Sequence, residues 1–149
     1  STANYNIYGV LYNWAAAMNG ANSSDANPSG VQGVCPAGWH LPSDAEWTQL
    51  TDFLGGEIVA GGCLKETGKY YWNSPNEGAT NETGFTALPG GLRNYHGYFN
   101  EIGNNGAWWS ATESEEWSAW YRCVTYDRSE MSRDDYYKEL GFSVRCIRD

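Results

Sequence analysis

The sequence predicts an α+β fold, in which short helices pack on small twisted antiparallel sheets joined by long irregular loops. One amphipathic helix with clear ends lies in the first half of the chain, at residues 43–54. Three segments with strand character, 106–112, 120–126 and 141–147, close the chain. A helix followed by strands, with glycine-rich loops between them, is typical of an α+β domain. The length of 149 residues suits one domain over 1–149.

The helix carries its own start and stop signals. Ser43 and Glu46 form a capping box, in which each side chain accepts a hydrogen bond from a backbone N–H at the helix start. Gly55 supplies a left-handed position that ends the helix. One mostly apolar stripe has i, i+3, i+4, i+7 spacing and must face a core; it consists of Trp47, Leu50, Thr51 and Leu54.

Weaker signals place the other elements. We expect a strand at 5–14, a helical turn at 15–18, an irregular loop at 21–33, a short extended segment at 61–66 and a hairpin tip at 95–100. In the strand at 120–126, alternation puts Arg122 and Val124 on one face, and Tyr121 and Cys123 on the other. The segment 127–140 has no clean periodicity.

Net charge limits the partners. The chain has 9 lysines and arginines against 18 acids, a formal charge of −9. Nucleic acid and anionic membrane surfaces are therefore excluded as partners, because both are polyanions. No run of about 18 apolar residues is present, so we expect no direct membrane insertion.

Aromatic residues are unusually abundant and are mostly amphipathic. The chain contains eight Trp and eleven Tyr, against four Phe. Trp and Tyr concentrate where an apolar face also meets water, as it does at binding sites. The alternative use of these residues is to extend the thin core of a small, loop-rich domain, and we expect both uses in this chain.

Four cysteines without a C-x-x-C pair do not indicate a zinc site. An even number in a small acidic domain favours disulfides and an oxidising compartment. Four cysteines allow three connectivities, and their spacing does not choose among them.

Four stretches carry a resemblance to a known family. They are CPAGWHLPSDAEW from Cys35, GFTALPGG from Gly84, WWSATE from Trp108 and GFSVRCIRD from Gly141. Together they resemble the Fibrobacter succinogenes major paralogous domain of secreted and cell-surface bacterial proteins. The resemblance implies a C-type lectin-like fold, related to formylglycine-generating enzymes and to retroelement-diversified variable proteins. It also implies an extracellular or cell-surface location, with an outer-membrane anchor in a segment outside this sequence.

In the variable proteins, a segment placed like 117–140 carries changeable binding residues between framework positions. Here the implied displayed residues are Trp117, Tyr121, Thr125, Asp127, Arg128, Glu130, Ser132, Asp134, Asp135, Tyr136 and Tyr137. Rigid aromatics mixed with short polar side chains are typical of a paratope. We therefore expect an adhesin-like module that binds a protein or carbohydrate receptor on another cell surface. The main alternative is a structural spacer of a surface protein.

The resemblance also implies a disulfide between Cys35 and Cys146. Cys63 and Cys123 stand at positions where the family has other residues, which suggests a second, local disulfide; the alternative is two buried free thiols. Each of these four positions is a cysteine in this sequence.

The residues do not predict an enzyme or a tightly bound cofactor. His40 precedes the helix cap and is expected to be structural, and His96 has no nucleophile identifiable from spacing. A formylglycine-generating activity would need a reactive cysteine pair and a longer chain. The sugar-binding signatures of animal C-type lectins are missing. Calcium remains a weaker option, with oxygen ligands from Asp127, Glu130, Asp134 and Asp135.

Overall fold

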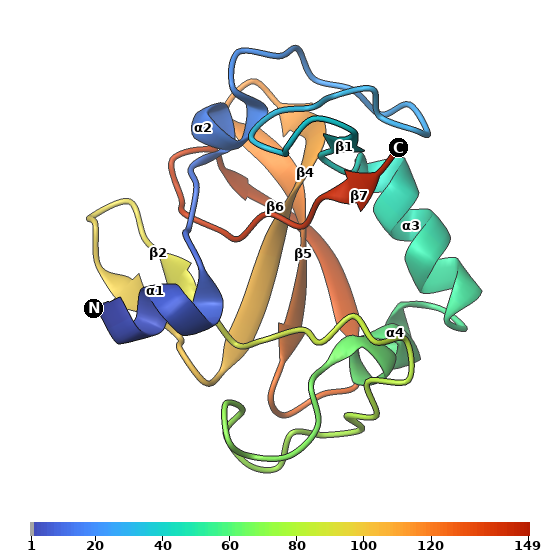
Figure 1. Ribbon diagram of the computed structural model, residues 1–149, viewed down its shortest axis with the longest axis vertical. Coiled ribbons are helices and arrows are strands. Elements are labelled where there is room, and N and C mark those ends of the chain that lie inside the picture. The colour runs from blue at the N-terminus through green and yellow to red at the C-terminus, as the bar shows by residue number, and fades with distance from the viewer. Residues whose placement is uncertain (1) are drawn as a thin grey trace.

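The computed structural model describes residues 2–149 and confirms the α+β class (Figure 1). Its helices are α1 (Thr2–Tyr8), α2 (Trp14–Met18), α3 (Asp44–Phe53) and α4 (Glu57–Leu64). Its strands are β1 (Trp39–His40), β2 (Leu92–Arg93), β3 (Phe99–Asn100), β4 (Asn105–Glu115), β5 (Ser118–Thr125), β6 (Met131–Tyr137) and β7 (Ile147–Arg148). No described helix is long and apolar enough to cross a membrane.

A three-stranded antiparallel sheet of order β4-β5-β6 forms the centre of the fold, and the helices lie around it (Figure 1). Two small antiparallel pairs, β1–β7 and β2–β3, complete the strand pairing. The predicted strands 106–112 and 120–126 correspond to β4 and β5, and the predicted hairpin tip corresponds to β2–β3. The C-type lectin-like assignment within the α+β class stays a prediction.

Both faces of the central sheet are covered by core. Trp109 and Ala119 belong to a cluster that includes Trp14 of α2 and Phe142. Trp108 and Val124 point to the other face, where they join Trp47 of α3 and residues of α4. This two-sided burial decides which residues of β5 are available to a partner.

Helix α3 is confirmed with its predicted ends. Ser43 is the N-cap and forms the capping box with Glu46. Its neighbour Asp44 is buried and accepts a hydrogen bond from Arg122 Nη1 at 2.6 Å. Arg133 Nε donates to the second oxygen of the same carboxylate at 2.9 Å. The helix start is therefore tied to β5 and β6 by a shared carboxylate.

Two local predictions were wrong in the first half of the chain. Residues 5–14 form no strand: α1 covers 2–8, and only Tyr12 finds a strand partner, Phe142. Residues 61–66 lie largely in α4, despite two consecutive glycines. A Cβ on Gly61 would run into the Glu130 carbonyl, and one on Gly62 into the Gly78 carbonyl. These glycines permit close approach to neighbouring backbone, which outweighs their low helix propensity.

The last third of the chain also differs from the prediction. The segment 127–140 contains β6, which pairs with β5 over seven positions. The predicted strand at 141–147 is reduced to isolated bridges at residues 141–143 and to β7. Alternation in β6 is hidden because it is a sheet edge whose side chains are mostly polar on both faces.

One disulfide joins Cys35 to Cys146, across 111 residues of sequence. This is the pairing that the family resemblance implied. The expected second disulfide is absent, since Cys63 and Cys123 are free thiols. Cys63 lies on α4, while Cys123 lies on the β5 face that packs against the core cluster of Trp109. Burial raises the pKa of Cys123 to about 12, so this thiol is unreactive at neutral pH.

Candidate ligand-binding surface

The residues predicted to be displayed extend from one end of the β5–β6 pair to the other. They lie along β5 and β6, and the run from Ser118 to Thr125 alone spans about 23 Å at roughly 3.3 Å per residue. Trp117, Tyr136 and Tyr137 lie at the end of the sheet where β4 turns into β5. Asp127, Arg128 and Glu130 lie at the opposite end. The structure therefore divides the prediction into an aromatic end and a charged end.

At the charged end, a buried lysine donates hydrogen bonds to the backbone of the turn between β5 and β6. Lys65 is fully buried, and its ammonium donates to the carbonyls of Glu77, Thr125 and Arg128 at 2.7–2.8 Å. Burial lowers the pKa of Lys65 to about 8. Asp127 and Arg128 are exposed above this cage. Lys65 therefore holds the backbone of this turn in place, and Asp127 and Arg128 are its exposed side chains.

The middle of the predicted surface is less exposed than its ends, and Tyr121 is partly exposed and packs against the core. The Tyr121 ring lies 4.6 Å from Phe142 and 6.2 Å from Trp109, measured between ring centroids. Its burial raises its pKa far above the ordinary value of tyrosine. Thr125 and Ser132 are also only partly exposed, and Ser132 Oγ donates to the Cys123 carbonyl. These residues contribute to the sheet and its core.

The aromatic end has the exposure expected of a binding surface. Trp117, in the turn between β4 and β5, is 69% exposed, and Tyr137 at the end of β6 is 57% exposed. The neighbouring Tyr136 meets Tyr137 edge to face, with ring centroids 5.5 Å apart. Tyr95, at the tip of the β2–β3 hairpin, is 61% exposed and is the fourth aromatic. We call Tyr95, Trp117, Tyr136 and Tyr137 the aromatic surface.

Two hollows adjoin at this surface and share Tyr95 as a wall. The larger, of about 360 Å³, is lined by Tyr95, Trp117, Tyr137, Lys138 and Glu139. The smaller, of about 200 Å³, lies between Tyr95 and Tyr136 and reaches the rings of Tyr121 and Phe142. Tyr121 thus serves as a packed floor beneath a hollow. The rings come from three segments that are distant in sequence, and residues of β4, of β5 and of the segment after β6 complete the smaller hollow.

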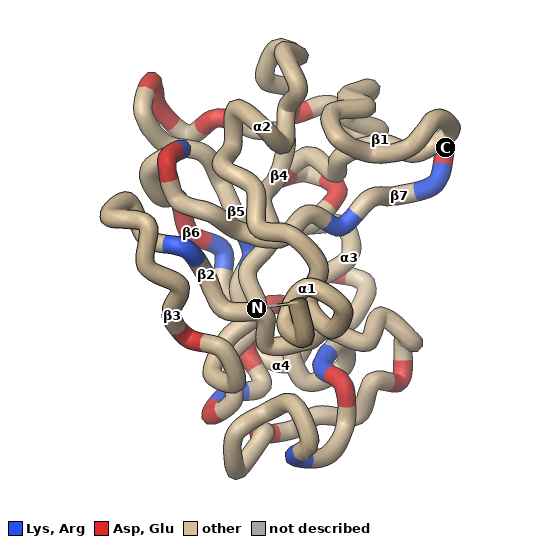
Figure 2. The backbone as a smooth tube through the Cα atoms, turned by 60° about the vertical axis from the view of Figure 1, so that its left-hand side comes forward, with Lys and Arg blue, Asp and Glu red and all other residues tan. Residues whose placement is uncertain are grey.

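Acidic side chains surround the sheet without forming a metal cluster. Among residues 2–149, no group of three or more His, Cys, Asp or Glu side chains is placed to hold a metal ion. The four acids considered as calcium ligands are divided, with Asp127 and Glu130 at the charged end, and Asp134 and Asp135 in β6. Figure 2 shows acidic positions spread over several loops and strands.

Comparison with known proteins assigns the family. Residues 1–148 match the sequence profile of the Fibrobacter succinogenes major domain. The chain belongs to this family. No curated protein and no solved structure matches the chain.

The family motif that starts at Cys35 contains a histidine with a structural role. In this Fibrobacter succinogenes major domain, His40 Nε2 lies 2.8 Å from Glu46 Oε1, and His40 Nδ1 lies 2.7 Å from Asp149 Oδ1. Burial lowers the pKa of His40, but the two carboxylates raise it by more, so the net shift is upward. The contacts connect β1, α3 and the residue after β7.

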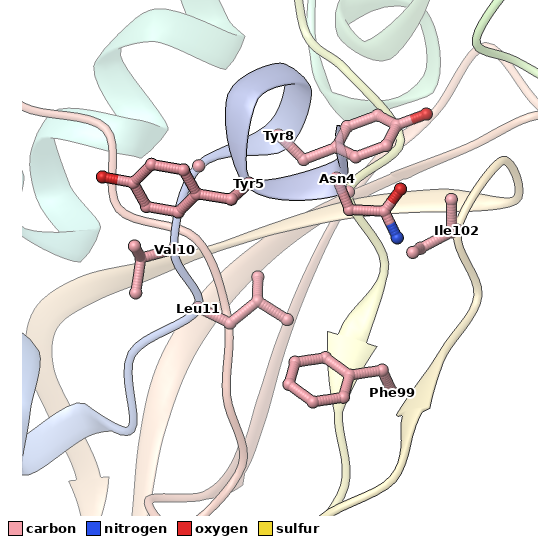
Figure 3. A pocket seen from close by; sticks show the side chains of 9 residues that line it. Asn4, Tyr5, Tyr8, Val10, Leu11, Phe99 and Ile102 are labelled. Carbon is pink, nitrogen blue, oxygen red and sulfur yellow. The ribbon is translucent and has the colours of Figure 1, made fainter. Parts of the chain in front are cut away.

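A further hollow, of about 350 Å³, lies between α1 with the residues that follow it and the residues in and after β3 (Figure 3). Phe99 and Ile102 face Leu11 and Asn4 across it, and no charged residue lines it. Helix α1 has no buried residue. This hollow has aromatic rings but no charged residue in its lining, so it lacks the mixture of rings and charges found at the aromatic surface.

Sequence reasoning missed Tyr95 as a functional candidate. The resemblance directed attention to 117–140, and Tyr95 lies outside that segment. A signal was present, because the predicted hairpin tip at 95–100 contains three aromatic residues that a small hairpin cannot bury. Tyr95, Tyr98 and Phe99 are all more than 60% exposed. Only the fold shows that Tyr95, and not its neighbours, stands beside Trp117 and Tyr137.

Proposed function

We propose that this domain is a non-catalytic binding module of a secreted or cell-surface protein, and that it holds a protein or glycan receptor at the aromatic surface. One observation carries the proposal. Exposed aromatic rings from the β2–β3 hairpin, the β4–β5 turn and β6 meet around two adjoining hollows. Large rings that stay exposed together are typical of interaction sites on folded domains.

The surface is supported by a rigid floor, which favours binding over loose packing of the rings on themselves. Phe142 is buried, and it contacts both Trp109 and Tyr121 with ring centroids 4.4 and 4.6 Å apart. Lys138, between the two turns, donates to Glu113 Oε1 at 2.6 Å and to the Glu116 carbonyl at 2.7 Å. A preorganised surface loses little conformational entropy when a ligand binds.

The location proposal rests on the family and on the disulfide. A domain with a Cys35–Cys146 bridge suits an oxidising compartment, and we expect the family to which it belongs in secreted and cell-surface proteins. The proposal keeps Trp117, Tyr136 and Tyr137 from the segment that the resemblance singled out, and it adds Tyr95. It treats Tyr121 as the floor of the smaller hollow and gives the charged end no part in binding.

The test compares receptor capture by the wild-type domain and by the double variant Trp117→Ala/Tyr137→Ala. A glycan array and a panel of cell-surface proteins serve as probes, each with and without EDTA. Tyr70→Ala is the matched control, because Tyr70 is an 86% exposed tyrosine in the loop after α4. We expect at least one ligand whose binding is lost in the double variant and kept in the control.

Two results would contradict this function. A ligand that the double variant binds as well as the wild type would place the binding surface elsewhere. If the wild-type domain binds neither the glycan array nor the panel of cell-surface proteins, the structural spacer alternative is favoured. Loss of binding in EDTA would instead show that a divalent ion takes part, as in a calcium-dependent lectin.

A further inference from the structure

The charge around the aromatic surface narrows the ligand class. Among the residues that line its two hollows, Glu139 is the acid and Lys138 is the base. The rings of the aromatic surface come from three segments, 92–95, 113–117 and 134–140. These segments contain six acidic residues and two basic ones. The acids are Glu113, Glu115, Glu116, Asp134, Asp135 and Glu139, and the bases are Arg93 and Lys138. An anionic ligand would meet repulsion at this end of the sheet, and a cationic one would be attracted.

The cation on the lining of the larger hollow does not change this balance. Lys138 is 19% exposed and is committed to Glu113 and the Glu116 carbonyl. Its ammonium also lies 4.8 Å from the centroid of the Trp14 ring. Lys138 and Glu113 therefore neutralise each other, which leaves five acids against Arg93 in these segments, and Glu139, on the rim of the same hollow, is exposed.

The rings themselves suit a cation. The faces of Trp and Tyr carry negative electrostatic potential and attract ammonium and guanidinium groups within about 6 Å of the ring centroid. Tyr95, Trp117 and Tyr137 come from three different elements and line one hollow of about 360 Å³. The same chain already places cations on rings elsewhere, since Arg133 lies 3.5 Å from the centroid of Trp120.

We propose that the larger hollow binds a lysine or arginine side chain from a basic segment of a partner protein, between the rings of Tyr95, Trp117 and Tyr137. The surrounding carboxylates attract the segment, and the rings hold the inserted cation. This inference rests on the proposed binding function and specifies its ligand. It favours a protein partner over a neutral glycan, because a neutral sugar has no net charge for the surrounding carboxylates to attract.

The test uses a capped peptide of alternating lysine and glycine as the probe, with binding mapped by NMR through the backbone amides and the Trp117 indole. The same peptide with every lysine acetylated is the matched ligand, since acetylation keeps length and removes charge. We expect the lysine peptide to shift the Trp117 and Tyr137 signals and the acetylated peptide to leave them unchanged. Raising the salt from about 10 mM to about 150 mM shortens the Debye length from roughly 30 to 8 Å and should weaken binding.

Single-residue variants separate the contribution of the aromatic rings to peptide binding from that of the carboxylates. Trp117→Ala should weaken peptide binding by about 5- to 30-fold, which corresponds to the loss of a partly desolvated cation–π contact. Glu139→Gln should weaken it less and should also reduce its salt dependence. Tyr70→Ala should bind as the wild type does. Thermal unfolding of each variant checks that the fold is kept.

The outcomes distinguish this inference from the proposed function. No shift with the lysine peptide, or equal binding of the acetylated peptide, overturns the cationic ligand. If an N-acetylglucosamine trimer then binds in a Trp117-dependent and salt-insensitive manner, the binding function stands with a neutral glycan as its ligand. If receptor capture is also independent of Trp117, both proposals fail.

Discussion

Replacement of Tyr121 by alanine tests the division between core and display that the structure draws. The Tyr121 ring is packed against Phe142 and near Trp109, and its side chain is only partly exposed. Aromatic-to-alanine changes in full cores cost about 3–5 kcal/mol. Because Tyr121 is not fully covered, we expect a loss of about 2–4 kcal/mol in the free energy of unfolding, and roughly 4–15 °C in Tm for a chain of this length.

Matched variants show whether this loss is specific. Tyr121→Phe keeps the packed ring and should cost less than about 1 kcal/mol. Tyr137→Ala removes an exposed ring and should change stability by no more than about 0.5 kcal/mol. Urea unfolding followed by circular dichroism, with thermal melts in parallel, measures all three. Equal stability of Tyr121→Ala and Tyr137→Ala would refute the reasoning and would return Tyr121 to the displayed surface.

Three further predictions concern the supports of the fold. Lys65→Met should lower the free energy of unfolding by about 2–4 kcal/mol in urea titrations, because three carbonyls lose their charged donor; an unchanged midpoint would contradict the role of the cage. The raised pKa of His40 means that the protonated side chain stabilises the folded state. This contribution to the free energy of unfolding is complete below pH 6.5, the ordinary pKa of histidine, and is lost as the pH rises through the higher pKa of the folded state. The free energy of unfolding, measured across that pH range, should lose this pH dependence in His40→Gln. An identical pH dependence in the wild type and the variant would contradict this role of His40. Reduction of the Cys35–Cys146 disulfide should cost about 2–5 kcal/mol, whereas Cys63→Ser under oxidising conditions should leave stability nearly unchanged.

Local signals were sufficient for several elements. The capping box of Ser43 and Glu46 predicted the start of α3, and the left-handed Gly55 predicted its end. Each end is readable from the sequence because it depends on hydrogen bonds between residues only a few positions apart. The strands β4 and β5 were predicted from their aromatic and β-branched content. The family motifs implied the pairing of Cys35 with Cys146, which spacing did not determine.

The sequence by itself determined the α+β class, the end points of its main helix, the family, and an acidic chain with more Trp and Tyr than a core needs. Only the tertiary structure decided how those aromatics are used. Alternation in β5 separates two faces, but it does not reveal that Phe142, from a distant segment, covers the face of Tyr121. Tyr95 likewise lines one hollow together with Trp117 only through the placement of the β2–β3 hairpin. The physical reason is the same in both cases: burial and convergence depend on contacts between residues far apart in sequence, and no local pattern records them.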